Sequence, residues 1–149
     1  AIYQSCSIKK KVVEIDEKEK NLRKILNFGH TFAHAYEATL GYSKKLNHGE
    51  AVILGIKTAS KFSRVNKILN INEFKLIENH LNKLSLPCNV SNFFSSSNLN
   101  KIISFMRNDK KNSTKKINLV LLKKIGYPLF NYQFNEKKIK FFLKKELIK

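Results

Sequence analysis

The sequence predicts a single, mainly α-helical domain with a small β-hairpin near its C-terminus. Apolar residues recur at helical spacing through most of the chain, and residues that favour helix starts precede several of these runs. Branched and aromatic residues instead dominate two short runs on either side of Gly126-Tyr127-Pro128, which predicts two paired strands. With 149 residues, no internal repeat and no low-complexity linker, the chain fits one domain.

The pattern places each element in turn. Helices are expected at 1–15, 22–40, 47–66, 72 or 73–84, 98–107 and after Asn135, and strands at 117–122 and 129–134. Gly29 is a point where the second helix can break into two pieces, and Gly41 is placed to cap its end. Asn47 should cap the longest helix, because Glu50 follows three residues later and can return the capping bond.

The chain is strongly basic, with 29 Lys and Arg against 11 Asp and Glu and a net charge of +18. Such a charge is typical of proteins that bind polyanions, phosphorylated substrates or acidic membranes. A base-composition bias explains it as well, because Lys is accompanied by much Asn and Ile, as an AT-rich genome would encode. No helix-turn-helix, RNP-type or zinc-finger pattern supports a nucleic-acid-binding domain, which is the main non-enzymatic alternative. We therefore expect the basic side chains to cover the surface broadly.

Cysteine use and hydropathy bear on the compartment. Cys6 and Cys88 are lone thiols without the spacing of a zinc knuckle or a disulfide framework. No apolar run approaches the ~20 residues that span a bilayer, and no signal-peptide core is present. We therefore expect a cytoplasmic protein with no membrane partner. Ala1 begins inside an expected helix and is not Met, so the chain is expected to be a piece of a longer protein.

Three of the four histidines fall within 19 positions, at His30, His34 and His48. His30 and His34 are four residues apart, so they share one face of a helix. His48 follows a short polar break that can fold back and bring it to the pair. Spacing alone suggests that His30 and His34 bind a metal ion, with His48 as a third ligand. Each histidine alone would be interpreted as an ordinary core or surface residue, but together they predict side chains that converge.

Longer motifs around these histidines resemble the 3-dehydroquinate synthase family. The run Leu22–Glu37, LRKILNFGHTFAHAYE, resembles the family signature, and His48–Val52, HGEAV, resembles the segment that follows it. Upstream, Lys9–Glu19 is similar to the stretch before the signature, and downstream Met106–Lys111, MRNDKK, is similar to its R-x-DKK segment. The motifs keep the family's order over nearly all of the chain.

The resemblance implies a metal- and NAD-dependent lyase of the shikimate pathway of aromatic amino acid biosynthesis. Such an enzyme converts the phosphorylated sugar acid DAHP to 3-dehydroquinate and releases phosphate. The implied cofactors are zinc or cobalt, together with NAD held mainly by an N-terminal domain. The implied partners are this small-molecule substrate and, for the complete enzyme, further copies in a homo-oligomer. Another sugar-phosphate cyclase of the same superfamily is the enzymatic alternative, since such enzymes share the histidine framework.

The resemblance also assigns residues 1–149 to the family's C-terminal helical domain, which binds metal and substrate. Family members are much longer, and no Gly-rich phosphate loop occurs in this chain. The NAD-binding N-terminal domain is therefore expected to act in cis or in trans, and the chain alone is expected to be inactive.

Residue by residue, the resemblance revises the pairing that spacing suggested. His30 and His48 match the two histidine metal ligands, whereas His34 matches a histidine that contacts the substrate. The other substrate-site matches are Lys9, Arg23, Asn27, Glu19 and one of Lys110 or Lys111. Cations suit a substrate that carries a carboxylate and a phosphate, because Arg clamps a carboxylate at two points and Lys supplies a point charge.

Two residues depart from the family pattern. Ala33 and Asn21 stand where the family usually has Gly. Ala is the better helix former, and Asn tolerates positive φ, so both are expected to be accommodated.

Overall fold

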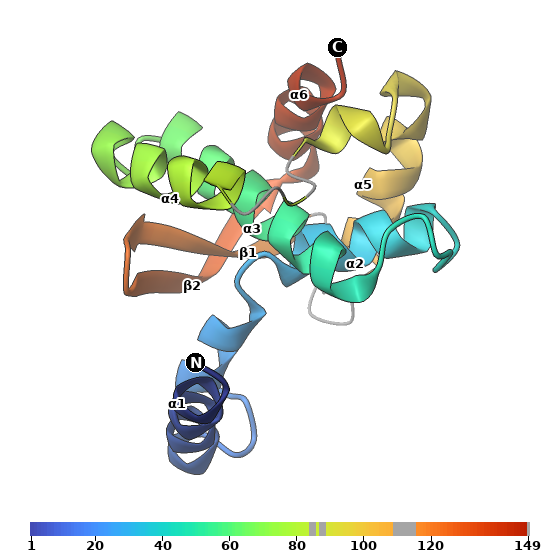
Figure 1. Cartoon of the computed structure of the whole chain (residues 1–149). Coiled ribbons are helices and arrows are strands. Elements are labelled where there is room, and N and C mark those ends of the chain that lie inside the picture. Colours follow the sequence, from blue (N-terminus) through green and yellow to red (C-terminus); the bar gives the residue numbers. More distant parts are fainter. Residues whose placement is uncertain (84–85, 87–88, 109–115, 149) are drawn as a thin grey trace.

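The computed structural model describes residues 1–83, 86, 89–108 and 116–148, and its fold is mainly α-helical (Figure 1). The α-helices are α1 (Ile2–Ile15), α2 (His30–Thr39), α3 (His48–Val65), α4 (Ile71–Lys83), α5 (Leu99–Arg107) and α6 (Glu136–Glu146). The short 3-10 helices are η1 (Leu22–Asn27), η2 (Val90–Asn92) and η3 (Ser96–Asn98). Strands β1 (Lys116–Lys124) and β2 (Tyr127–Asn135) form an antiparallel hairpin, so the predicted fold class is confirmed.

The predicted break at Gly29 is confirmed. Gly29 has a φ of +82° and separates η1 from α2, because this left-handed backbone ends one helix before the next begins. The predicted capping box of α3 is also present, with the Asn47 N–H donating to Glu50 Oε2 at 2.9 Å. At the start of α6, the Asn135 side chain accepts a hydrogen bond from the Lys137 N–H, as its position predicted.

The hairpin differs from the prediction in its length and its turn. Both strands extend beyond the expected 117–122 and 129–134, and the turn lies at Ile125-Gly126. Pro128 lies inside β2, paired with Leu122. A proline is tolerated there because each strand of a two-stranded sheet has a free edge that needs no N–H.

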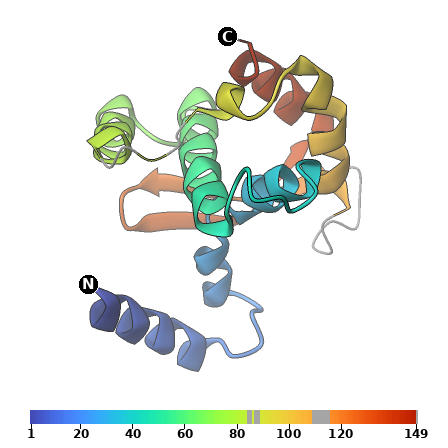
Figure 2. The same cartoon turned by 45° about the vertical axis from the view of Figure 1, so that its right-hand side comes forward.

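The core lies where α2 and α3 pack together and α5, α6 and β1 close around them (Figure 2). Fully buried members include Phe32, Tyr36, Leu54, Phe62, Ile102, Met106, Ile117, Leu121, Ile139 and Leu143. Ala33 is also completely buried, so its methyl group is packed in the core. Val65 stands at helical spacing from the buried Phe62 and was expected to be buried with it, but this was wrong, because Val65 ends α3 and is 55% exposed.

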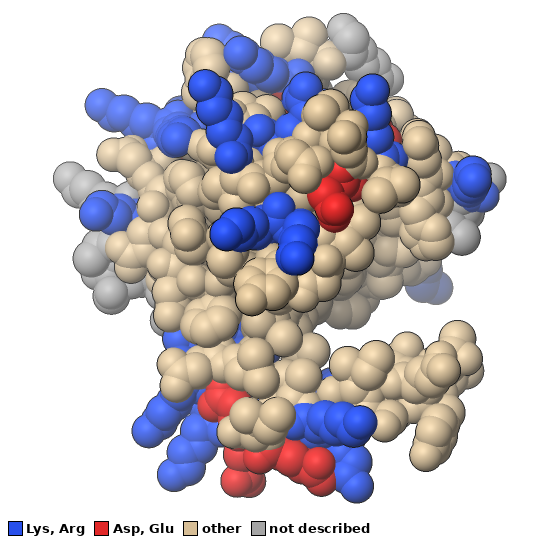
Figure 3. Space-filling view, turned by 90° about the vertical axis from the view of Figure 1, so that its left-hand side faces the viewer, with Lys and Arg blue, Asp and Glu red and all other residues tan. Residues whose placement is uncertain are grey.

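Helix α1 stands apart from this core. None of its residues is buried, and its main contacts within the described chain are with η1 (Figures 1 and 2). Ile2, Tyr3, Ile8 and Ile15 are all exposed. Figure 3 shows this segment separated from the body of the molecule on the visible face.

Positive side chains are spread over the face of the molecule that Figure 3 shows. Figure 3 shows Lys and Arg side chains in several separate groups on the visible face, as expected for a broad compositional excess. Among the described helices, none combines the length and the apolar character required to traverse a bilayer.

Candidate metal and substrate site

Two helix starts bring the three histidines of the motif together. His30 opens α2, His34 follows one turn later, and His48 opens α3. The ring centroids lie 5.5 Å apart for His30 and His34, and 6.3 Å apart for His48 and each of the other two. The predicted convergence is therefore confirmed. His30 is half-buried, whereas His34 and His48 are exposed, so the cluster faces outward.

Hydrogen bonds hold two of these rings by the same nitrogen. His30 Nδ1 lies 3.3 Å from the carbonyl oxygen of Phe28, and His48 Nδ1 lies 3.0 Å from Glu37 Oε1. Each partner is an acceptor, so each bond favours the tautomer with the proton on Nδ1. The lone pair then lies on Nε2, and this arrangement is usual for histidines that bind metal.

The two rings suit a shared metal ion in chemistry and approximately in spacing. Neutral imidazole nitrogens are ligands that zinc and similar divalent metals accept. Two imidazoles on one tetrahedral ion would hold their centroids about 5 Å apart, so His30 and His48 need to approach by about 1 Å. No group of three or more His, Cys, Asp or Glu side chains within the described residues is arranged to hold a metal ion. His30 and His48 therefore fit as part of a ligand set, not as a complete one.

The turn before η1 is organised by Asp16, whose carboxylate accepts three backbone N–H bonds. These come from Lys20 at 2.9 Å, Asn21 at 2.7 Å and Arg23 at 3.0 Å. Desolvation alone would raise the pKa of Asp16, but the three hydrogen bonds stabilise the ionised form and bring the pKa below its ordinary value. Asp16 therefore fixes the backbone that carries Glu19 and Arg23.

Within this turn, the left-handed residue is Glu19, with a φ of +52°, and not Asn21, whose φ is −135°. Asn21 was predicted to tolerate positive φ, but its φ in the structure is negative. Glu19 accepts a hydrogen bond from Asn27 Nδ2 at 2.5 Å, so these two predicted site residues are joined directly. Arg23 Nη1 donates to the Glu17 carbonyl at 2.6 Å, which directs the guanidinium toward the turn.

Two hollows flank the start of α2 and meet at Thr31. The first has a volume of about 370 Å³ and is lined by Glu19, Asn27, Thr31 and residues of the hairpin. The second, of about 430 Å³, is lined by Thr31, His34, Tyr42 and others. Thr31 Oγ1 lies 3.4 Å from the Asn118 carbonyl, to which it donates. Thr31 was not predicted as a site residue, because its hydroxyl carries no pattern of its own.

Of the remaining predicted site residues, Lys9 lies in the described part of the chain. Lys9 is exposed on α1, and no described hydrogen bond or ion pair joins it to the histidine cluster. Lys110 and Lys111 lie outside the described residues, as does Cys88.

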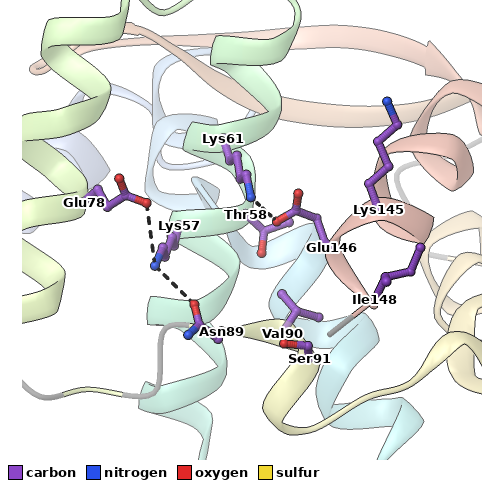
Figure 4. Close-up of a pocket in the computed structure, with 10 residues that line it drawn as sticks. All are labelled: Lys57, Thr58, Lys61, Glu78, Asn89, Val90, Ser91, Lys145, Glu146 and Ile148. Atoms are coloured by element: carbon purple, nitrogen blue, oxygen red, sulfur yellow. Dashed lines mark hydrogen bonds and ion pairs between the residues drawn. The ribbon is translucent and has the colours of Figure 1, made fainter.

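A further pocket of about 220 Å³ lies between α3, α4 and the C-terminal segment, and two of its lysines are paired with glutamates (Figure 4). Lys57 Nζ lies 4.0 Å from Glu78 Oε1 and 3.5 Å from Asn89 Oδ1. Lys61 Nζ lies 2.7 Å from Glu146 Oε2. These pairs tie neighbouring segments to α3, so we interpret the pocket as structural.

Comparison with known proteins identifies the family. Residues 1–112 match the family model described as 3-dehydroquinate synthase C-terminal. The chain belongs to this family. It is 72% identical over 149 residues to 3-dehydroquinate synthase of Pelagibacter ubique (strain HTCC1062), covering 100% of this chain and 40% of the relative. It is 44% identical over 132 residues to 3-dehydroquinate synthase of Endomicrobium trichonymphae, covering 88% of this chain and 35% of the relative. The chain thus spans 40% or less of the length of these relatives.

Solved structures share the fold of this chain at low sequence identity. One is a 2-deoxy-scyllo-inosose synthase complexed with carbaglucose-6-phosphate, NAD+ and Co2+, with a TM-score of 0.66 and 22% identity over 89% of this chain and 37% of that chain. Another is a 2-epi-5-epi-valiolone synthase from Streptomyces hygroscopicus subsp. jinggangensis 5008 with NAD+ and Zn2+ bound. Its TM-score is 0.70, with 20% identity over 91% of this chain and 36% of that chain.

Proposed function

We propose that this chain is the metal- and substrate-binding part of a 3-dehydroquinate synthase, a lyase of the shikimate pathway. The enzyme would convert DAHP to 3-dehydroquinate and release phosphate. The observation that carries the proposal is the convergence of His30, His34 and His48 in a chain of this family. The 72% identity to the Pelagibacter ubique enzyme supports the choice of reaction.

His30 and His48 would hold a divalent metal ion, zinc or cobalt, through their Nε2 atoms. When bound, the metal would polarise a substrate hydroxyl or carbonyl oxygen. The chain's own contribution is to orient the two rings, because Phe28 O and Glu37 Oε1 each fix one Nδ1. A ring whose tautomer is already set loses less freedom when it binds the ion.

The substrate would lie in the hollows on either side of Thr31. His34 lines one hollow, where it can hydrogen-bond to the substrate, and the joined pair Glu19 and Asn27 lines the other. Lys9, Arg23 and one of Lys110 or Lys111 would bind the carboxylate and the phosphate. Arg23 would then have to exchange its bond to the Glu17 carbonyl for one to the substrate.

NAD would be bound mainly by an N-terminal domain, in cis or in trans, and would supply the hydride acceptor for the oxidation and return the hydride later. The chain covers 40% of the length of the Pelagibacter ubique relative, and the rest of that relative is long enough to contain such a domain. We also infer a homo-oligomer for the complete enzyme. The exposed, unpaired thiol of Cys6 is compatible with the reducing cytoplasm that we propose as the compartment.

A chimaera tests the proposal. This chain would replace the aligned 149 residues of the Pelagibacter ubique enzyme, and phosphate release would be measured with DAHP, NAD and zinc or cobalt. We expect turnover of DAHP, and a loss of turnover of two or more orders of magnitude with His48→Ala. Gly49→Ala is a matched control, because a Cβ at Gly49 meets no atom within 4 Å.

The same chimaera separates the alternatives. Turnover of a phosphorylated sugar without a carboxylate, such as glucose 6-phosphate, in place of DAHP would indicate another cyclase. An inactive chimaera that binds duplex DNA tightly, with affinity that falls steeply with salt, would favour the basic nucleic-acid-binding alternative.

A further inference from the structure

Glu37 is a nearly buried carboxylate whose partner is a predicted metal ligand. It lies in the last part of α2 and is 9% exposed, whereas most charged side chains of this protein are on the surface. Its Oε1 lies 3.0 Å from His48 Nδ1. The contact joins the end of α2 to the first residue of α3 and so spans the segment 40–47.

We propose that Glu37 is a positioning residue that sets the tautomer and orientation of His48. The carboxylate accepts the Nδ1–H bond, so the Nε2 lone pair of His48 is left available for a metal ion. This inference rests on the proposed metal-binding role of His48. It adds a residue that does not itself bind the metal and that acts only through the imidazole.

The burial of Glu37 restricts the movement of its carboxylate, so the carboxylate can hold the His48 ring in one orientation. The side chain of Glu37 is 11% exposed and that of His48 is 63% exposed, so the carboxylate is the fixed partner and the imidazole is the one that needs fixing. His30 Nδ1 lies 3.3 Å from the carbonyl oxygen of Phe28, a neutral acceptor at a longer distance. A charged acceptor makes a stronger hydrogen bond than a neutral carbonyl, so the bond of Glu37 to His48 is stronger than the bond of the Phe28 carbonyl to His30.

The first test reads the tautomer directly in the metal-free 149-residue chain. Two-bond ¹⁵N–¹H correlation spectra in mildly alkaline buffer distinguish a proton on Nδ1 from one on Nε2. In the wild type, we expect His48 to carry its proton on Nδ1. In Glu37→Ala, we expect a mixture of both tautomers, whereas Glu37→Gln keeps a neutral acceptor and should retain the Nδ1–H form. Far-UV circular dichroism would establish that each variant is folded.

The second test measures Co²⁺ binding by the paramagnetic broadening of the His30 and His48 ring signals. Glu37→Ala should raise the apparent Kd for Co²⁺ by about 10- to 100-fold, as is typical when the acceptor behind a metal-binding histidine is removed. Glu37→Gln should raise it by less. Glu50→Gln is the matched control, because it removes a carboxylate close to His48 that bonds to the Asn47 N–H and not to the ring. It should change neither the tautomer nor the Kd.

The outcomes separate this inference from the proposed function. A wild-type His48 with its proton on Nε2 would overturn the inference even if Glu37→Ala failed to fold. An unchanged tautomer in a folded Glu37→Ala chain would overturn it as well. If the tautomer depends on Glu37 but Co²⁺ does not broaden the ring signals, Glu37 still positions His48, and the metal-binding part of the proposed function fails instead.

Discussion

Gly29 and Gly55 meet backbone to backbone where the start of α2 packs on α3. A Cβ on Gly55 would collide with the carbonyl oxygen of Gly29, and a Cβ on Gly29 would lie 2.6 Å from the backbone nitrogen of Ile56. Gly55 is seven residues after His48, or about 10 Å along α3. This close approach therefore sets the separation of the two helices that carry His30 and His48.

Gly55→Ala should destabilise the chain by about 1–3 kcal/mol, because the added methyl group has no space and must push the helices apart. Urea unfolding would measure the change in the free energy of unfolding. Gly49→Ala, in the same helix, should be neutral or stabilising by up to about 1 kcal/mol, since its Cβ meets nothing within 4 Å. Equal stabilities for the two variants would contradict the close approach.

Tyr36 should make the fold sensitive to alkali. Burial raises its pKa well above the ordinary value of 10.0, and its hydroxyl donates to Thr58 Oγ1 at 3.1 Å. The contribution of the neutral Tyr36 side chain to the stability of the fold is complete below about pH 10. It is lost at higher pH, because the unfolded chain then releases a proton that the folded chain retains. Tyr36→Phe should cost about 1 kcal/mol at neutral pH and reduce this alkaline loss in denaturant titrations.

Tyr42→Phe is the control for that titration, because Tyr42 is 76% exposed. The alkaline loss of stability should be the same in Tyr42→Phe as in the wild type. If Tyr36→Phe and Tyr42→Phe behaved alike, ionisation of the buried hydroxyl would not be the cause.

Asp16 should show the opposite pH dependence. Its pKa is lowered, so its contribution to stability is present above the unfolded value of about 3.9 and is lost as the pH falls below it. Asp16→Ala should speed amide hydrogen exchange at Lys20, Asn21 and Arg23, because their N–H groups donate to the Asp16 carboxylate. Glu17→Gln, with an exposed side chain in the same turn, should leave those rates unchanged.

Glu146→Gln should weaken the link between α6 and α3. Lys61 Nζ lies 2.7 Å from Glu146 Oε2, with the two side chains 40% and 16% exposed. We expect a loss of up to about 1 kcal/mol, smaller at high salt, measured by thermal unfolding at two ionic strengths. Glu136→Gln, which affects a more distant pair of 4.0 Å with Arg107, should cost less.

The isolated 149-residue chain should not release phosphate from DAHP, even with NAD and zinc supplied. Two histidine ligands leave a catalytic metal short of the usual three protein ligands, so it should bind weakly. Addition of the N-terminal part of the Pelagibacter ubique enzyme should tighten metal binding and restore phosphate release together. Measurable turnover by the chain alone would refute this division of the site.

Local sequence signals predicted much of the fold and part of the site. The capping box at Asn47, the break at Gly29 and the i, i+4 pair His30 and His34 all depend on residues close together in the chain. Such signals do not require knowledge of the tertiary structure. They were sufficient to predict that His48 would return to the other two histidines.

The features that were not predicted depend on contacts between residues far apart in the chain or on which residue of a turn adopts positive φ. The contact of Glu37 with His48 exists only because segment 40–47 folds back, and nothing in the spacing marks Glu37 as buried. Val65 fits the apolar stripe of α3 but lies at the end of the helix, where it is 55% exposed. Asp16 determines the turn by accepting three backbone N–H bonds, and the residue with positive φ in this turn is Glu19. The φ preferences of the single residues do not predict this position.

The separation of α1 from the core has a consequence for cooperativity. A helix of 14 residues is marginally stable in water unless another surface covers one of its faces, and α1 contributes no buried residue. It can therefore melt without opening the core, as an independent unit with its own, lower free energy of opening. On heating, far-UV signals should begin to change before the near-UV signals of the buried tyrosine. A single two-state transition would then not describe the unfolding of this chain.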